Sequence, residues 1–216
     1  MNAADYDRWY RSGHGRWIGE RETDLIRGYL APRAGESLLD VGCGTGFFTR
    51  ALGESIDGLL VGADIDADWL AYAREQDRGG GCYERADARS LPHPDRSFDL
   101  VTSITVLDFV DEDARALAEM VRVARRRVVV LVLNRCSLLW WQKGMHGGSG
   151  GYAGARWYRP GEARRLFDGL PVSNVRRQSG IILPGGGWHA RWLERHWPAR
   201  LPLGGVILLS ADVEHG

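Results

Sequence analysis

The strongest constraint on how this chain folds is a glycine-rich turn that follows a short apolar run. The turn spans residues 40–46 (DVGCGTG), comes after Leu38 and Leu39, and leads into the helical pattern of residues 47–52 (FFTRAL). Alternating glycines allow positive φ angles and let a ligand approach more closely than a Cβ would permit. The first N–H groups of a helix have no partner within it and favour a polar or anionic ligand. This stretch therefore predicts a buried strand, a tight turn and a helix start at a ligand site.

The details of the turn distinguish two kinds of nucleotide ligand. A dinucleotide-binding turn has the spacing G-x-G-x-x-G and places a pyrophosphate on the helix N-terminus. Here the spacing is G-x-G-x-G, and Phe47 occupies the last glycine position. Asp40 at the strand end would repel a pyrophosphate, whereas it would attract an ammonium group. A ligand with an amino-acid head group and an adenosine tail therefore fits better than NAD, and a turn without any ligand is the weaker interpretation.

The same stretch resembles motif I of the class I S-adenosylmethionine (SAM)-dependent methyltransferases, and the chain resembles their type-11 methyltransferase-domain family. The resemblance implies that SAM is the cofactor and that S-adenosylhomocysteine (SAH) is its product. It assigns five residues of the turn to the cofactor site: Asp40, Gly42, Cys43, Gly44 and Gly46.

A second acidic strand end follows the turn. Residues 58–66 (GLLVGADID) predict a strand, and Asp64 lies 18 residues beyond Gly46, near the separation at which a nucleotide fold places a ribose-binding carboxylate. Such a carboxylate accepts hydrogen bonds from both ribose hydroxyls, each contributing on the order of 1.5–3 kcal/mol. Ile65 is expected to pack on the adenine face. An acid that only stabilises the turn is the alternative interpretation of Asp64.

Two further strands complete the expected cofactor site. Residues 82–88 (CYERADA) end in an acid, and the methyltransferase pattern implies that Asp87 and the N–H of Ala88 contact adenine. Residues 98–103 (FDLVTS) are similar to the family's F-D-L-V motif, whose end faces the transferred methyl group. The resemblance assigns four residues here to the lining of the pocket: Ser103, Ile104, Thr105 and Leu107.

Strands alternate with helical patterns over residues 36–133, which predicts a doubly wound, mostly parallel α/β sheet of the Rossmann-like kind. Residues 172–175 and 206–211 read as a closing strand pair. The resemblance then implies seven strands with an antiparallel edge and helical cap elements. An amphipathic helix is expected from Asp111, and its arginine-rich end (residues 122–127) is explained by the helix dipole.

We expect one domain over residues 1–216. Its parts are a helical cap segment (1–35), a SAM-binding core (36–133), and a region with a lid loop, a substrate cap and the closing strands (134–216). The glycine-rich run 144–154 predicts the lid. Residues 185–197 are expected to form a helical cap or, equally, an apolar contact surface.

The acceptor site is expected where the aromatic N-terminus meets this cap. A similar N-terminal segment folds over the cofactor in the type-11 family, and an aromatic face beside a cationic sulfur is favourable. Aromatic residues that only pack the first helix onto the sheet are an equal alternative. The candidate acceptor residues are Tyr6, Tyr10, Leu107, His146 and Trp188.

No catalytic base emerges from the sequence. The sulfonium of SAM is a good leaving group, so the protein mainly positions the reactants. A base is needed only when the pKa of the acceptor lies well above the working pH. His14, His146 and His189 are candidates, and surface or packing positions explain each of them as well. The catalytic residue is therefore unassigned.

Charge and cysteine content limit the partners. The chain has 28 basic and 28 acidic residues, which removes the broad basic surface of a nucleic-acid binder and leaves an apolar or aromatic small molecule as the expected acceptor. Its three cysteines lack metal-binding or redox spacing, so no metal and a cytoplasmic location are expected. The apolar run 128–133 is too short to span a bilayer, and the acidic N-terminus is unlike a signal peptide.

Three functions remain open at this point. The leading one is methyl transfer from SAM to a small molecule. The second is binding of SAM or SAH without catalysis, since no base is fixed. The third, a nucleotide-dependent oxidoreductase, is disfavoured by Phe47 and Asp40.

Overall fold

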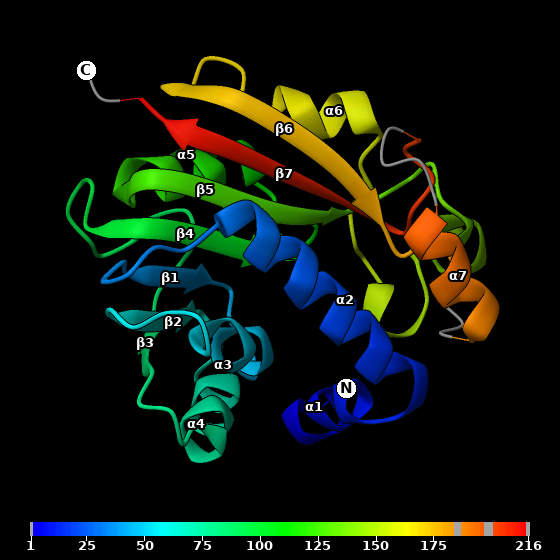
Figure 1. Cartoon of the computed structure of the whole chain (residues 1–216), viewed down its shortest axis with the longest axis horizontal. Coiled ribbons are helices and arrows are strands. Elements are labelled where there is room, and N and C mark those ends of the chain that lie inside the picture. The colour runs from blue at the N-terminus through cyan, green and yellow to red at the C-terminus, as the bar shows by residue number, and fades with distance from the viewer. Residues whose placement is uncertain (1, 184–186, 197–200, 215–216) are drawn as a thin grey trace.

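A seven-stranded sheet with the order β3-β2-β1-β4-β5-β7-β6 runs through the molecule (Figure 1). The computed structural model describes residues 2–183, 187–196 and 201–214. Strands β1 to β5 are parallel, whereas β7 is antiparallel to both β5 and β6. The mostly parallel α/β sheet with an antiparallel edge is therefore confirmed. The strands are β1 (Leu38–Val41), β2 (Leu60–Asp64), β3 (Cys82–Arg85), β4 (Phe98–Ile104), β5 (Ala124–Leu133), β6 (Val172–Gly180) and β7 (Val206–Val213).

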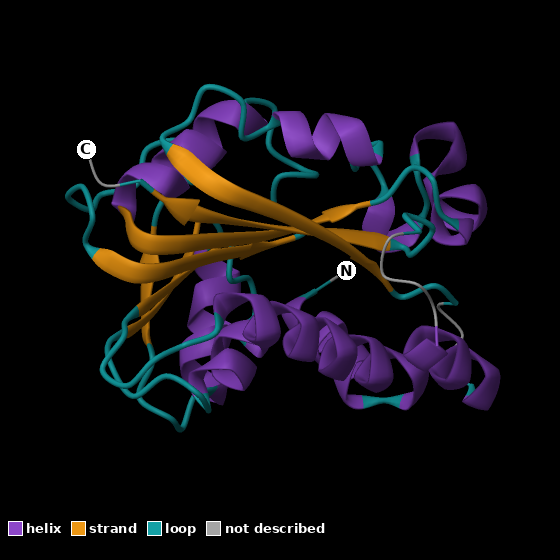
Figure 2. Ribbon diagram, turned by 45° about the horizontal axis from the view of Figure 1, so that its top comes forward, coloured by secondary structure: helices purple, strands orange, loops and turns teal. Residues whose placement is uncertain are grey.

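Helices cover both faces of this sheet (Figure 2). They are α1 (Ala3–Arg11), α2 (Gly13–Leu30), α3 (Phe47–Gly53), α4 (Ala67–Gln76), α5 (Asp113–Val123), α6 (Pro160–Arg165) and α7 (Trp188–His196). Within the described residues, no helix combines the length and apolar character that crossing a membrane requires.

Strand β5 shows why the central strands are continuously apolar. Val128, Val130 and Val132 lie in one buried cluster, whereas Val129 and Leu131 lie in another. The first cluster includes Leu117 of α5 and Phe167, and the second includes Ile26 of α2 and Phe48 of α3. A parallel strand with both faces covered has no solvent-facing side to make polar.

The prediction that residues 122–127 form the end of a helix is wrong. Helix α5 begins at Asp113 rather than Asp111 and ends at Val123, so Arg125, Arg126 and Arg127 lie in β5. Each has an acidic partner on another segment: Asp99 for Arg125, Glu36 for Arg126 and Asp212 for Arg127. Arg126 also donates to the carbonyls of Leu30 and Ala31, where α2 ends. These tertiary partners explain the arginines better than a helix dipole does.

The glycine-rich run is more structured than a plain loop. The short helical turn η1 (Trp140–Gly144) leads into it, and two more, η2 (Met145–Gly147) and η3 (Gly150–Tyr152), lie within it. Residues 188–196 of the segment expected to be a cap or a contact surface form the helix α7, whereas Gly185, Gly186 and Trp197 lie outside the described residues.

Candidate functional site

The glycine turn has the backbone conformation that its sequence predicts. Gly42, Gly44 and Gly46 have φ angles of 74°, 54° and 71°, all in the left-handed region. The N–H groups of Gly42 and Cys43 donate to the carbonyl of Ala63 at 2.7 and 3.0 Å, which fixes the turn to β2. A Cβ at Gly42 would lie 2.2 Å from Val106, so this glycine is also required by packing.

Two of the three predicted acids lie beside the turn. Asp40 is buried at the end of β1 and accepts a hydrogen bond from the Thr49 hydroxyl at 2.6 Å. Burial raises the pKa of Asp40 to about 7. Asp64 ends β2 and accepts the N–H groups of Gly44 at 2.7 Å and of Asp66 at 2.9 Å. Because a carboxylate has about four acceptor positions, Asp64 retains capacity for two hydroxyl donors.

The third acid, Asp87, is engaged by its own neighbour. The Arg89 side chain donates to both carboxylate oxygens, at 3.0 Å from Nε and 2.7 Å from Nη2. These bonds lower the pKa of Asp87 to about 2. An adenine amine would therefore have to share or displace this contact.

The remaining predicted cofactor residues differ in how accessible they are. Ile65 is 56 % exposed, as an apolar side chain beside a ligand site would be. Ala88 is partly buried, Ile104 is buried in the α2-side cluster, and the Cys43 side chain packs with Tyr83. The buried Ser103 hydroxyl finds no hydrogen-bond partner among the described residues, which is consistent with a partner supplied by a ligand.

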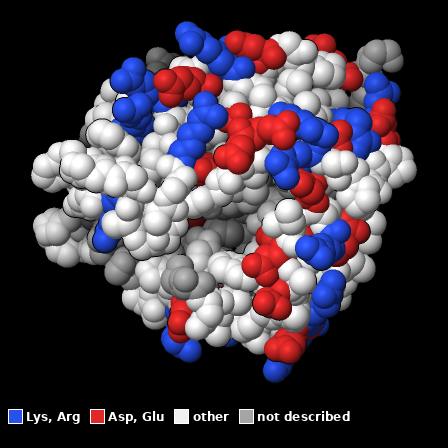
Figure 3. All heavy atoms as spheres, turned by 180° about the vertical axis from the view of Figure 1, so that it is seen from behind, with Lys and Arg blue, Asp and Glu red and all other residues white. Residues whose placement is uncertain are grey.

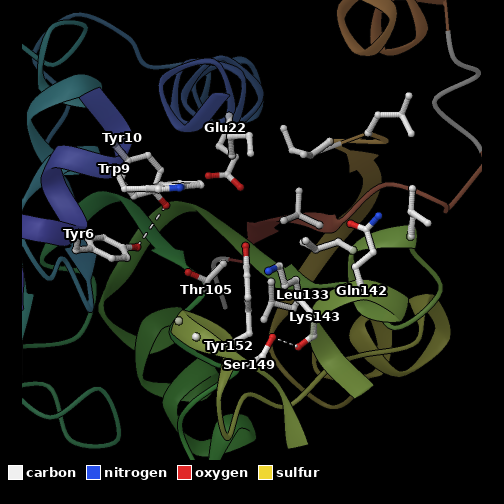
Figure 4. A pocket seen from close by; sticks show the side chains of 18 of the residues that line it. Tyr6, Trp9, Tyr10, Glu22, Thr105, Leu133, Gln142, Lys143, Ser149 and Tyr152 are labelled. Atoms are coloured by element: carbon white, nitrogen blue, oxygen red, sulfur yellow. Dashed lines mark hydrogen bonds between the residues drawn. The ribbon is translucent and has the colours of Figure 1, made fainter. Parts of the chain in front are cut away.

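A cavity of about 860 Å³ is lined by residues of α1, α2 and the end of β4 (Figure 4), and its wall residue Tyr10 stacks on Phe47, which follows the glycine turn. Thr105, which follows β4, has a left-handed φ of 56°, a conformation that β-branched residues adopt at a cost of about 1–3 kcal/mol and that is frequent at binding sites. Side chains from both ends of the chain and from the helical turns form the walls. They are Tyr6, Trp9, Tyr10, Ile18, Glu22, Thr105, Phe109, Leu133, Leu138, Leu139, Gln142, Lys143, Ser149, Tyr152, Ile181, Leu183, His189 and Val206.

Tyr6, Tyr10, Thr105 and His189 are the predicted residues that this cavity brings together. Leu107 does not reach it, because it is 1 % exposed in the cluster on the α5 side, where its carbonyl accepts the Tyr158 hydroxyl at 3.0 Å. Trp188 is 72 % exposed and does not line the cavity. His146 lines a separate hollow beside Trp140 and Trp157. The side chain of His14 is outside the described part of the structure.

Glu22 is the pocket residue that the sequence analysis missed. Its carboxyl points from α2 into the cavity (Figure 4), although the residue is only 5 % exposed. No hydrogen bond or ion pair joins it to another described residue, and burial raises its pKa to about 8. The sequence does contain a signal for it: Glu22 is an acid on the same helical face as the apolar residues Ile18, Leu25 and Ile26, where an acid is unusual.

The charges around the molecule are mixed. The face shown in Figure 3 has a hollow, with acidic side chains along part of its rim and basic and acidic side chains interspersed elsewhere. Within the described residues, no group of three or more His, Cys, Asp and Glu side chains is arranged to hold a metal ion.

These features define an α/β protein that has a strand, a glycine turn and a helix in succession, together with a pocket that has aromatic walls. A family model described as a methyltransferase domain matches residues 39–132, which include the glycine turn and strands β2 to β4. The match confirms the resemblance inferred from the glycine turn.

Similar curated proteins are methyltransferases. Methyltransferase GfsG from Streptomyces halstedii is 34 % identical over 112 residues, which cover 50 % of this chain and 40 % of that protein. The 27-O-demethylrifamycin SV methyltransferase of Amycolatopsis mediterranei is 33 % identical over 127 residues, covering 52 % and 46 %. The matched parts are thus less than half the length of these relatives.

Solved structures share the fold over nearly the whole chain. A SAM-dependent methyltransferase from Thermotoga maritima, described as a possible histamine N-methyltransferase, has a TM-score of 0.76 and 20 % identity, with 98 % of this chain and 95 % of that chain covered. A magnesium protoporphyrin IX methyltransferase from Synechocystis with bound SAH has a TM-score of 0.62 and 16 % identity, with 91 % and 84 % covered. The comparisons confirm the fold class and SAM as the cofactor of the family.

Proposed function

We propose that this protein transfers the methyl group of SAM to a small-molecule acceptor with an apolar or aromatic body. The observation that carries this proposal is the 860 Å³ cavity, whose wall includes Tyr10, the residue that stacks on Phe47 immediately after the glycine turn. Its volume is within the range of small-molecule sites, and its walls are mostly apolar and aromatic. An acceptor held there would lie next to a cofactor held by the turn.

In this proposal the strand ends hold the cofactor. Asp64 accepts the ribose hydroxyls with its two remaining acceptor positions, and Asp40 attracts the ammonium of the amino-acid head group. Ile65 covers one adenine face, while Asp87 and the Ala88 N–H contact the adenine edge. Gly42, Gly44 and Gly46 keep the turn open to the ligand. Cys43, Ser103 and Ile104 complete the lining of this half of the site.

When bound, SAM supplies an activated methyl group on a sulfonium. The residues of the chain position the acceptor and exclude water. Tyr6, Trp9 and Tyr10 form one wall, and Thr105 lies where β4 ends. Positioning of this kind accounts for much of the rate enhancement in reactions that have a good leaving group.

Calorimetric titration with SAM, SAH and NAD tests the cofactor half of the proposal. We expect micromolar affinity for SAM or SAH and no NAD binding. A screen of apolar amines, alcohols and thiols then measures SAH formation by mass spectrometry. SAM binding without turnover on any class would support a binding protein, whereas NAD binding in place of SAM would overturn the cofactor assignment.

A further inference from the structure

Glu22 is a buried acid without a counter-charge. The nearest basic residue along α2, Arg21, is directed at Glu194 of α7, with Nε 3.2 Å from the Glu194 carboxylate. No cation of another described residue pairs with Glu22. An ionised carboxylate in such surroundings is costly unless a cation joins it. A positively charged ligand in the cavity would therefore stabilise the ionised form of Glu22.

Aromatic rings surround the same carboxyl. Tyr6 and Tyr10 of α1 lie on one side, and their hydroxyls are 3.3 Å apart. Figure 4 shows Trp9 beside them, and shows the Tyr152 hydroxyl pointing toward Glu22 from the opposite wall. Burial raises the pKa of all three tyrosines, and the charge of Glu22 adds to the rise, which places Glu22 close to each of them. Aromatic faces attract ammonium groups, and this attraction grows when water is excluded.

The other titratable groups that line the cavity are few. Besides Glu22, they are Lys143 of η1, His189 of α7, Tyr6, Tyr10 and Tyr152. Lys143, the only lysine of the chain, is exposed, and no ion pair joins it to another described residue. Apart from Thr105, Gln142 and Ser149, the remaining side chains of the lining are apolar or aromatic, with Ile181 as an example.

We propose that Glu22 is the recognition group for a primary or secondary amine on an apolar acceptor, holding its ammonium among Tyr6, Tyr10 and Tyr152. This inference rests on the proposed methyltransferase function and names the acceptor class of the same cavity. The apolar body of the acceptor lies against residues such as Ile181.

Glu22 also provides a place for the proton that the amine must lose before it is methylated. The ammonium N–H passes its proton to the Glu22 carboxylate, which frees the nitrogen lone pair. The N–C bond then forms as the C–S bond breaks, and the sulfur keeps the electron pair. The Glu22 proton leaves to solvent when the product departs. Because burial raises the pKa of Glu22 to about 8, this carboxyl is far more basic than an exposed carboxylate and narrows the pKa difference from an alkylamine to about 2 units, which favours such an exchange.

A pH dependence of binding follows from this arrangement. Below pH 8 the empty cavity holds Glu22 in its protonated form, so an ammonium ligand must displace that proton. Affinity for an amine therefore rises between pH 6.5 and 8.5, whereas affinity for a neutral ligand does not.

Titration calorimetry with two matched probes tests the proposal. The probes are 2-phenylethylamine and 2-phenylethanol, which share a ring and chain length, and each is titrated with and without saturating SAH. At pH 8.5 the wild-type protein is expected to bind the amine at least about tenfold more tightly than the alcohol. At pH 6.5 the preference shrinks, and amine binding releases about one proton, measured from heats in two buffers.

Glu22→Gln and Glu20→Gln are the matched variants. Both remove one carboxylate from α2, but Glu20 is exposed and paired with Arg16. We expect Glu22→Gln to lose the amine preference and its pH dependence while binding the alcohol within about threefold of wild type, and Glu20→Gln to behave as wild type. The proposal is overturned if the wild type does not bind the amine, binds the alcohol equally well, or if Glu22→Gln keeps the preference. Absence of SAH binding would instead refute the proposed function.

Discussion

Tyr10 of α1 stacks on Phe47 at the start of α3, with ring centroids 4.4 Å apart and planes inclined by 17°. Phe47 occupies the position where a dinucleotide-binding turn has its third glycine. Phe47, whose presence disfavours NAD binding, is therefore also the residue on which the N-terminal helix packs. Since Tyr10 lines the cavity, one aromatic pair connects the proposed cofactor and acceptor sites.

Substitution of Tyr10 tests this connection. Tyr10→Phe keeps the stacked ring and removes only the hydroxyl contact with Tyr6, so its cost should stay within about 1 kcal/mol. Tyr10→Ala removes the ring and should lower the free energy of unfolding by about 3–5 kcal/mol. Urea denaturation measures both, and equal effects of the two variants would show that the stack contributes little.

Asp64→Ala should weaken SAH binding by at least about tenfold, or about 1.4 kcal/mol. The reason is the loss of a charge-assisted acceptor for the ribose hydroxyls. Asp57→Ala is the matched control, because Asp57 also accepts a backbone N–H, that of Gly35 at 2.7 Å, before β1 begins. Calorimetry should find the affinity of this control unchanged, and a comparable loss in both variants would count against a ribose-binding role for Asp64.

The stability of the protein should fall between about pH 5 and pH 8. The pKa of Glu22 is raised from its ordinary 4.5 to about 8, so over this interval the unfolded chain loses a proton that the folded protein keeps. The loss amounts to a few kcal/mol, at about 1.4 kcal/mol per unit of pKa difference. Asp40, with its pKa raised to about 7, adds in the same direction.

Glu22→Gln removes only the Glu22 share of this pH effect. Thermal unfolding at several pH values should therefore show a flatter profile, with the variant more stable than wild type near pH 8. Identical profiles would show that the carboxyl is hydrated in the folded state.

Gly42→Ala should destabilise the fold by at least about 3 kcal/mol. Its φ of 74° is strained for alanine, and the added Cβ would meet Val106 at 2.2 Å. Gly35→Ala has a similar φ of 79° with nothing within 4 Å, so it should cost only about 1 kcal/mol. The difference between the two variants in chemical denaturation isolates the steric term, and a difference near zero would contradict it.

Arg89→Ala should raise SAH affinity by a few-fold, whereas Asp87→Ala should lower it. The arginine occupies both oxygens of the carboxylate that is proposed to contact adenine, and exposed pairs of this kind are readily broken. Calorimetry distinguishes the two effects. A loss of affinity in Arg89→Ala would indicate that Arg89 itself binds the cofactor.

Local patterns predicted most of the fold. The glycine turn, the acidic strand ends and the apolar run in β5 are each encoded in a few adjacent residues, and each appears where expected. The arginine run failed because its partners, such as Glu36 and Asp212, are remote in sequence. The helix-dipole argument uses only neighbouring residues, whereas the position of these arginines in β5 is stabilised by ion pairs with acids elsewhere in the chain.

The acceptor pocket was only partly predictable for a similar reason. The aromatic N-terminus indicated Tyr6 and Tyr10, yet the isolation of Glu22 depends on α1, the turn at Tyr152 and α7 closing around it. Leu107 was misplaced because its side chain packs in the cluster on the α5 side of the sheet, whereas Thr105 and Phe109, before and after it in the sequence, line the cavity.

Lys143 has a consequence for experiments on this protein. Because the printed chain contains a single lysine, a lysine-specific protease has one cleavage site in it, and that site lies in the wall of the cavity. A ligand that covers this wall should slow the cut, while a ligand confined to the glycine turn should not. The rate of one peptide-bond cleavage, followed on an unlabelled protein, then reports which half of the site is filled.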